Sequence, residues 1–122
     1  AGHRQDIADC YAAFDIFVMP SQLEGLCTSL IDALAAGIPA VASRAGGIPD
    51  VVVDGETGIL VPPLDAAALA SAVVSLWKDA ERRARFVENG RLRVDKFFTA
   101  ESMVAGTEAV YTRMKVAGAP GP

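Results

Sequence analysis

The sequence predicts an α/β fold, namely a partial doubly wound (Rossmann-like) parallel sheet of about three strands with helices on both faces and a helical carboxyl-terminal segment. Short β-rich apolar runs alternate with helix-like segments in the first half of the chain, and helix-like segments dominate the rest. Parallel strands need such crossover helices, which then cover both faces of the sheet. The chain has 122 residues, 52% hydrophobic and 21% charged, which is typical of one ordinary globular domain.

Apolar spacing and helix stop signals locate the elements of the first half. Ile7, Cys10, Tyr11 and Phe14 recur at helical spacing, and a Leu- and Ala-rich run ends at Gly37, a residue that commonly closes helices. The predicted order is a helix over 6–14, a strand over 15–19, a helix over 29–36, a strand over 39–43 and a short helix that ends at 53.

Capping residues locate the elements of the second half. Asp65, Asp79 and Thr99 are expected to cap three successive helices. The predicted order is a strand over 58–61, a helix over 66–78, a helix from Asp79 to about 97 and a last helix after Thr99. Gly90 weakens the third of these elements. The 66–78 helix has an apolar stripe of Leu69, Val73, Leu76 and Trp77. Mixed charges over 82–96 predict a solvated helix face. The domain is expected to span 1–116, with a flexible Gly/Pro-rich tail over 117–122.

Charge and composition exclude several classes of function. A net charge of −4 argues against a nucleic-acid partner, because phosphate backbones are bound by clustered Lys and Arg. Two cysteines, Cys10 and Cys27, and the lone His3 predict neither a disulfide framework nor a Cys/His zinc site. No cofactor is expected. The apolar run 66–77 is too short to cross a membrane. The two cysteines are expected to be buried thiols, which predicts a reducing, cytoplasmic compartment. The sequence does not decide whether a longer parent protein attaches peripherally to a membrane.

The turn over 20–25 is the main candidate site. A strand ends there and a helix follows, which places backbone N–H groups and a carboxylate where open α/β sheets bind nucleotides. Glu24 has an alternative role, because Ser21 and Glu24 also fit a capping box in which the carboxylate returns to the Ser21 N–H. Asp32 is equally compatible with an exposed helical acid, and Arg44 with an ordinary surface residue.

Five linked motifs resemble the carboxyl-terminal domain of the retaining GT-B glycosyltransferases often called group 1. They are Pro20-Ser21, Glu24-Gly25, the run from Asp32 to Ala42, Gly46-Gly47 and the run from Asp54 to Val61. The resemblance covers roughly 2–114 and implies a metal-independent transfer of sugar from a nucleotide-diphosphate donor to an acceptor, with retention. It also implies that the chain is the second half of the donor-binding domain and lacks the amino-terminal acceptor domain.

The resemblance assigns roles to residues on either side of the turn. It places Glu24 at the donor sugar, near the developing oxocarbenium ion, and Asp32 at the ribose hydroxyls of the nucleotide. Asp32 is one methylene shorter than the Glu usual in the family, so it is expected to reach the ribose less well or to draw the nucleotide closer. The diphosphate is expected to meet the backbone N–H groups of Gly25, Leu26, Cys27 and Thr28, together with the Thr28 hydroxyl.

Two further expectations and two alternatives complete the sequence-based interpretation. In the family, an Arg and a Lys upstream of Gly2 neutralise the diphosphate, so the isolated chain is expected to show no turnover. The bare edge of strand 15–19 is expected to support a homodimer or strand exchange. The alternatives are a non-catalytic assembly module and a fragment of a GT-B-type nucleotide-sugar epimerase.

Overall fold

The computed structural model describes residue 2 and residues 4–117 of the chain. It confirms the predicted fold class, because parallel strands alternate with helices and a helical segment follows. The strands are β1 (Phe17–Met19), β2 (Ala40–Ser43) and β3 (Gly58–Val61), and the helices are α1 (Ile7–Ala12), α2 (Thr28–Ala35), α3 (Ile48–Val51), α4 (Ala66–Lys78), α5 (Ala80–Phe97) and α6 (Ala100–Ala117). Ala117 thus ends a helix, and the rest of the predicted tail, 118–122, lies outside the described residues.

The three strands form one parallel sheet in the order β1-β2-β3. Met19 lies opposite Ala42 and Ser43 lies opposite Val61, so the carboxyl ends of the strands lie along one edge of the sheet. All four residues of β2 are buried, as expected for a central strand covered on both faces. The loops that follow β1 and β2 are therefore neighbours.

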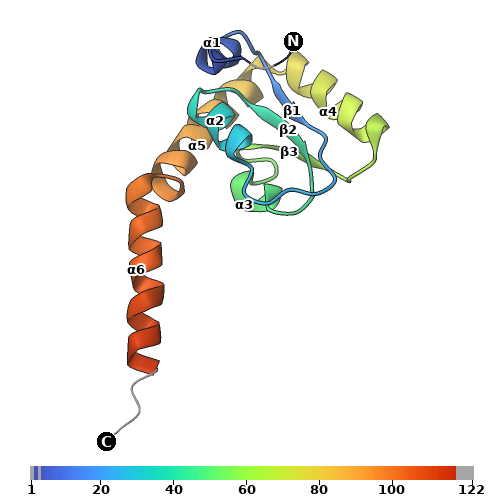
Figure 1. Cartoon of the computed structure of the whole chain (residues 1–122). Coiled ribbons are helices and arrows are strands. Elements are labelled where there is room, and N and C mark those ends of the chain that lie inside the picture. The colour runs from blue at the N-terminus through green and yellow to red at the C-terminus, as the bar shows by residue number, and fades with distance from the viewer. Residues whose placement is uncertain (1, 3, 118–122) are drawn as a thin grey trace, which may run out of the picture.

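Helices cover both faces of the sheet. Leu30 of α2 and Ile48 of α3 belong to the core cluster on one face, whereas Leu76 of α4 packs with Val41 and Phe86 on the other. Of the predicted α4 stripe, Leu69, Val73 and Leu76 join the core, but Trp77 is 57% exposed. Figure 1 shows α6 projecting away from the sheet and the other helices.

Arginines of α5 hold the ends of three other helices. Arg83 donates to the Leu76 carbonyl at the end of α4, Arg91 to Ala36 after α2, and Arg93 to Asp50 and Val51 in α3. Cations at helix carboxyl termini satisfy carbonyls that have no partner in the helix and interact favourably with the helix dipole. The mixed-charge segment is therefore only partly the solvated face that its sequence predicts.

Each of the three predicted N-cap side chains accepts a hydrogen bond from an N–H in the first turn of its helix. Asp65 accepts from the Ala68 N–H, Asp79 from the Arg82 N–H, and the Thr99 hydroxyl from the Ser102 N–H. Each bond satisfies an N–H in the first helical turn that no carbonyl of the helix can reach. Local sequence is sufficient to predict such caps because donor and acceptor lie three residues apart.

Leu64, between β3 and α4, has a left-handed backbone that leucine rarely adopts. Its φ is +63° and its side chain is 78% exposed, so little packing offsets the strain.

We expect Leu64→Gly to raise the free energy of unfolding by about 1 kcal/mol, because glycine tolerates this conformation. Urea denaturation followed by circular dichroism measures the change. Leu23→Gly is the control: Leu23 is 87% exposed without a positive φ, so its replacement should not stabilise the chain. Equal effects would contradict strain at Leu64.

Candidate functional site

The candidate site is the loop that joins β1 to α2 at the carboxyl edge of the sheet. Helix α2 begins at Thr28, with Cys27 as its N-cap residue, and not directly after Ser21. The capping-box interpretation of Ser21 and Glu24 is therefore wrong. The Ser21 hydroxyl instead donates to Glu24 Oε1 at 2.7 Å, a side-chain bond that orients a half-buried carboxylate within the loop.

Glycines after β2 support the backbone of Glu24. Gly46 has a φ of +50°, and a Cβ at this position would lie 2.1 Å from the Glu24 carbonyl oxygen. A Cβ at Gly47 would lie 2.3 Å from the Gly25 carbonyl oxygen, and the Gly47 N–H donates to the Glu24 carbonyl at 3.1 Å. The glycine pair was predicted as a turn, and the structure shows that it also lies against the Glu24 loop.

The backbone amides predicted to bind the diphosphate differ in availability. The Thr28 N–H donates to the Leu26 carbonyl at 2.9 Å, so this amide is used within the loop. Among the described residues, the N–H groups of Gly25, Leu26 and Cys27 donate to no backbone carbonyl. These amides stand at the positive end of the α2 dipole, where an anion is favoured.

At the start of α2, the backbone N–H of Cys27 is available to a ligand but its thiol is not. The side chain is only 2% exposed, and its Sγ donates to the Met19 sulfur at 2.8 Å. Burial, reinforced by the negative charge of Glu24, raises the pKa of the Cys27 thiol to about 11. The thiol is therefore protonated at neutral pH and unreactive as a nucleophile.

Asp32 lies one turn after Thr28 on the exposed side of α2. Among the described residues, no ion pair joins it to a Lys or Arg. Tyr11 of α1 is nearby: burial and then the charge of Asp32 raise the pKa of its phenol. Asp32 is thus an accessible carboxylate one turn into the helix.

A groove of about 370 Å³ runs from this part of α2 to the α5–α6 junction. Its walls come from two segments far apart in the sequence. The lining residues are Leu26, Thr28, Ile31 and Asp32 from the first segment and Phe97, Phe98, Thr99 and Met103 from the second. Small-molecule sites typically have volumes of about 300–1,000 Å³, so the groove is large enough for a small ligand.

Comparison with known proteins identifies the family. The sequence profile of the family described as "Glycosyl transferases group 1" matches residues 1–93. The chain belongs to the group 1 glycosyl transferases. A curated relative, the D-inositol 3-phosphate glycosyltransferase of Corynebacterium kroppenstedtii, is 41% identical over 98 residues, which cover 80% of this chain and 22% of the relative.

Solved structures of glycosyltransferases share the fold. Sucrose-phosphate synthase from Thermosynechococcus elongatus is 35% identical with a TM-score of 0.81, and the match covers 93% of this chain and 28% of that one. HepE of Anabaena, solved in complex with UDP-glucose, is 26% identical with a TM-score of 0.77 over 90% of this chain and 31% of its own. The chain thus spans less than a third of the length of each of these three relatives.

Two features of this group 1 domain were not predicted from the sequence. One is the groove wall at Phe98 and Met103, which lies about seventy positions from Asp32 and carries no local motif. The other is the partner of Arg44, which pairs with Asp54 at 2.7 Å on the surface. Asp54 also accepts from the Leu60 N–H, so the pair belongs to the turn before β3.

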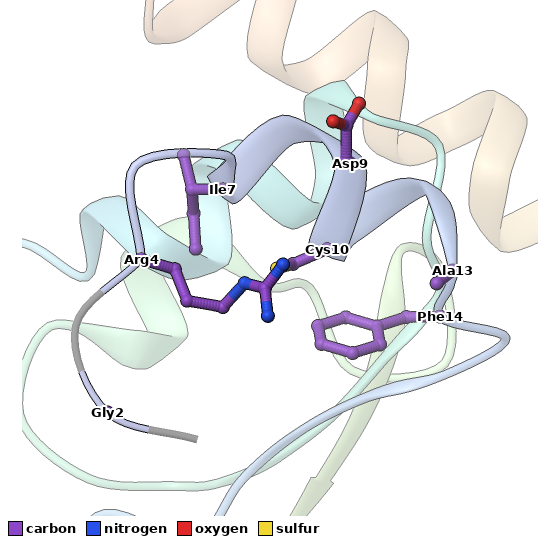
Figure 2. Close-up of a pocket in the computed structure, with 7 residues that line it drawn as sticks. All are labelled: Gly2, Arg4, Ile7, Asp9, Cys10, Ala13 and Phe14. Atoms are coloured by element: carbon purple, nitrogen blue, oxygen red, sulfur yellow. The ribbon is translucent and has the colours of Figure 1, made fainter.

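Another hollow, of about 690 Å³, lies beside α1 and away from the Glu24 loop. Figure 2 shows Ile7, Cys10 and Phe14 around it, together with Arg4. Arg4 pairs with Asp6, and the bond lowers the pKa of that carboxyl. The hollow therefore has mainly apolar walls, with the paired Arg4 and the acid Asp9 among its lining residues, and it shares no residue with the candidate site.

Two searches of the described residues were negative. No group of three or more His, Cys, Asp or Glu side chains is arranged to hold a metal ion within the described part of the chain. Among the helices of the same residues, none is long and apolar enough to cross a membrane.

Proposed function

We propose that this chain is the donor-binding part of a retaining glycosyltransferase that uses a nucleoside-diphosphate sugar. Glu24 would lie at the donor sugar, the 25–28 segment at the diphosphate and Asp32 at the ribose. The observation that carries the proposal is the placement of Glu24 and Asp32 on either side of the free amides at the start of α2. The UDP-glucose complex of the similar HepE domain supports a donor of this chemical class.

In the proposed reaction, the Glu24 loop of this chain acts together with other parts of a parent protein. The bond from the anomeric carbon to the diphosphate oxygen breaks, and the diphosphate leaves with its electron pair. The acceptor hydroxyl oxygen bonds to the same carbon and its proton passes to the departing diphosphate. Glu24 would stabilise positive charge at the sugar, while the α2 terminus would stabilise the leaving group. Residues 5–43 contain no Lys or Arg, so the leaving group lacks a cation from this segment.

We therefore propose that the 122-residue chain alone has no measurable turnover, whereas a longer parent protein transfers the sugar with retention. An assay of product formation, with the anomeric configuration read by NMR, compares the two proteins. A parent protein that depends on no nucleotide sugar would contradict the enzymatic assignment.

Donor binding is tested by titrating the chain with UDP, GDP and ADP and following the backbone amide signals of residues 24–32 by NMR. We expect one base to give saturable shifts, and Asp32→Ala to weaken that binding by about tenfold, because a charged hydrogen-bond acceptor is lost. Asp95→Ala is the control, since Asp95 is an exposed acid of α5. Unchanged affinity in Asp32→Ala would contradict the ribose assignment, and flat signals with all three nucleotides would contradict the donor site.

A homodimer through the 15–19 segment is a second proposal, because β1 lies at an edge of the sheet. Val18 of this strand is 39% exposed, and the edge is apolar. Exposed apolar edges favour pairing with another chain. Light scattering at high micromolar concentration should then show twice the monomer mass, and a monomer there would exclude the dimer.

A further inference from the structure

A small hollow of about 260 Å³ lies on the α4 face of the sheet, at the carboxyl edge of the strands. Its lining residues are Pro20 after β1, Ser43 at the end of β2, and Leu64, Asp65, Ala66 and Leu69 around the start of α4. None of them belongs to the 24–32 segment or to the groove beside Asp32. The hollow is therefore separate from the candidate site.

The Ser43 hydroxyl is a polar group in this hollow for which the fold supplies no partner. Ser43 is only 3% exposed, and because side chains alternate along β2, it points to the same face as Val41, toward α4. The hydroxyls of Ser21 and Ser75 each donate a hydrogen bond, whereas that of Ser43 forms none with any described residue. No fully enclosed side-chain oxygen of these residues lacks a partner, so the Ser43 hydroxyl opens onto the hollow that it lines. Buried hydroxyls are rarely left unpaired, which indicates a ligand here.

The start of α4 supplies further polar groups. Asp65 caps the helix through Oδ1, which accepts from the Ala68 N–H at 2.8 Å, and no Lys or Arg of the described residues forms an ion pair with this carboxylate. The Ala66 N–H stands in the first turn, where the helix offers no acceptor, and it donates to no other carbonyl within the described part of the chain. A hydroxyl, a carboxylate and a helix N–H thus come together beside apolar side chains.

This set of groups disfavours a charged ligand. No Lys or Arg is among the described residues that line the hollow, so an anion would meet the charge of Asp65 without a compensating cation. A cation would lie at the positive end of the α4 dipole, with a single carboxylate to hold it. A neutral ligand with several hydroxyls avoids both costs, because each hydroxyl can donate to a carboxylate and accept from a hydroxyl or an N–H.

We propose that this hollow binds one ring of a neutral hexose. The ring hydroxyls bond to Ser43, Asp65 and the Ala66 N–H, and the C–H face of the ring packs on the apolar side chains of Pro20 and Leu69. Sites for drug-sized ligands typically have volumes of about 300–1,000 Å³, so this smaller hollow suits a single ring. The inference does not rest on the proposed donor chemistry, because it uses no residue of the 24–32 segment.

Leu64 agrees with this assignment. Its strained backbone, with a φ of +63°, has no compensation in the free chain, where the side chain is 78% exposed. Strained backbone conformations cluster at ligand-binding sites. Because Leu64 lines the hollow, a bound ring would cover part of its side chain and offset the strain.

The test uses Ser43→Ala, which removes the hydroxyl without removing a hydrogen bond of the fold. Its free energy of unfolding should therefore not fall below that of the parent sequence. Ser75→Ala is the control, since Ser75 is an exposed serine of α4 outside the hollow. Asp65→Asn is a second variant, because asparagine also caps helices but carries no charge. The chain is titrated with D-glucose, D-mannose, D-galactose and inorganic phosphate, and the amide signals of 43 and 64–69 are followed by NMR.

We expect at least one hexose to give saturable shifts at these amides in the millimolar range, because the contacts are few. Ser43→Ala and Asp65→Asn should each weaken that hexose by about three- to tenfold, since one hydrogen bond is lost, and Ser75→Ala should bind like the parent sequence. Absence of saturable shifts with all three hexoses, or equal affinity in Ser43→Ala, would overturn the proposal. Phosphate binding at 64–69 in place of the hexoses would also overturn it, by showing that the hollow selects an anion. The donor site is judged separately, from the nucleotide shifts at 24–32.

Discussion

Replacing Gly46 with alanine is expected to lower the free energy of unfolding by about 3 kcal/mol and to displace the Glu24 loop. The φ of +50° costs a non-glycine residue about 1–2 kcal/mol, and the added Cβ would lie 2.1 Å from the Glu24 carbonyl oxygen. Forcing a methyl group into such a contact typically costs about 1–3 kcal/mol more. Because the obstructing atom is backbone, the loop itself must move, and the amide signals of 24–28 should shift.

Gly55→Ala separates backbone strain from this contact. Gly55 has a φ of +77°, but a Cβ there meets nothing within 4 Å. Its replacement should therefore cost only the strain, about 1–2 kcal/mol, and leave the Glu24 loop unchanged. Chemical denaturation gives both free energies. If Gly46→Ala is no more destabilising than Gly55→Ala, the glycine after β2 does not support the candidate site.

Phe86→Ala is expected to lower the free energy of unfolding by about 3–5 kcal/mol. The Phe86 side chain is completely buried and packs with Val41 of β2 and Leu76 of α4. It thereby attaches α5 to one face of the sheet, and its removal leaves a cavity that three elements must close. Urea denaturation measures the loss.

Phe97→Ala, eleven residues later on α5, is the matched control. Phe97 is 52% exposed, so the same truncation should cost less than about 1 kcal/mol. A similar loss in both variants would show that Phe86 is not a main packing contact between α5 and the sheet.

Several elements of the fold could be predicted because their signals are local. The segment 58–61 was predicted as a strand and 66–78 as a helix, and both have these limits in the structure. Asp65 and Asp79 were recognised as caps from donors three positions away. The predicted strand 15–19 and helix 29–36 agree with β1 and α2 to within two residues. The path of the loop between them, which packs against the glycines after β2, has no such local signal.

The candidate site was predictable only in part. Sequence motifs indicated Glu24 and Asp32 and the amides between them, because these residues lie on one continuous segment. They did not indicate that the Thr28 N–H bonds to Leu26 or that the Ser21 hydroxyl binds the Glu24 side chain. These contacts depend on the backbone conformation of the loop between β1 and α2, and the same sequence motif is compatible with several such conformations.

The sequence by itself determined the order of strands and helices, the helix caps and the family, because alternating propensity, caps and linked motifs act over a few neighbouring residues. The tertiary structure decided which distant residues meet: Gly46 with Glu24, the α5 arginines with the ends of other helices, and Met103 with the groove beside Asp32. Such contacts depend on the path of the whole chain and on close packing between elements, and neither has a periodic signature in the sequence.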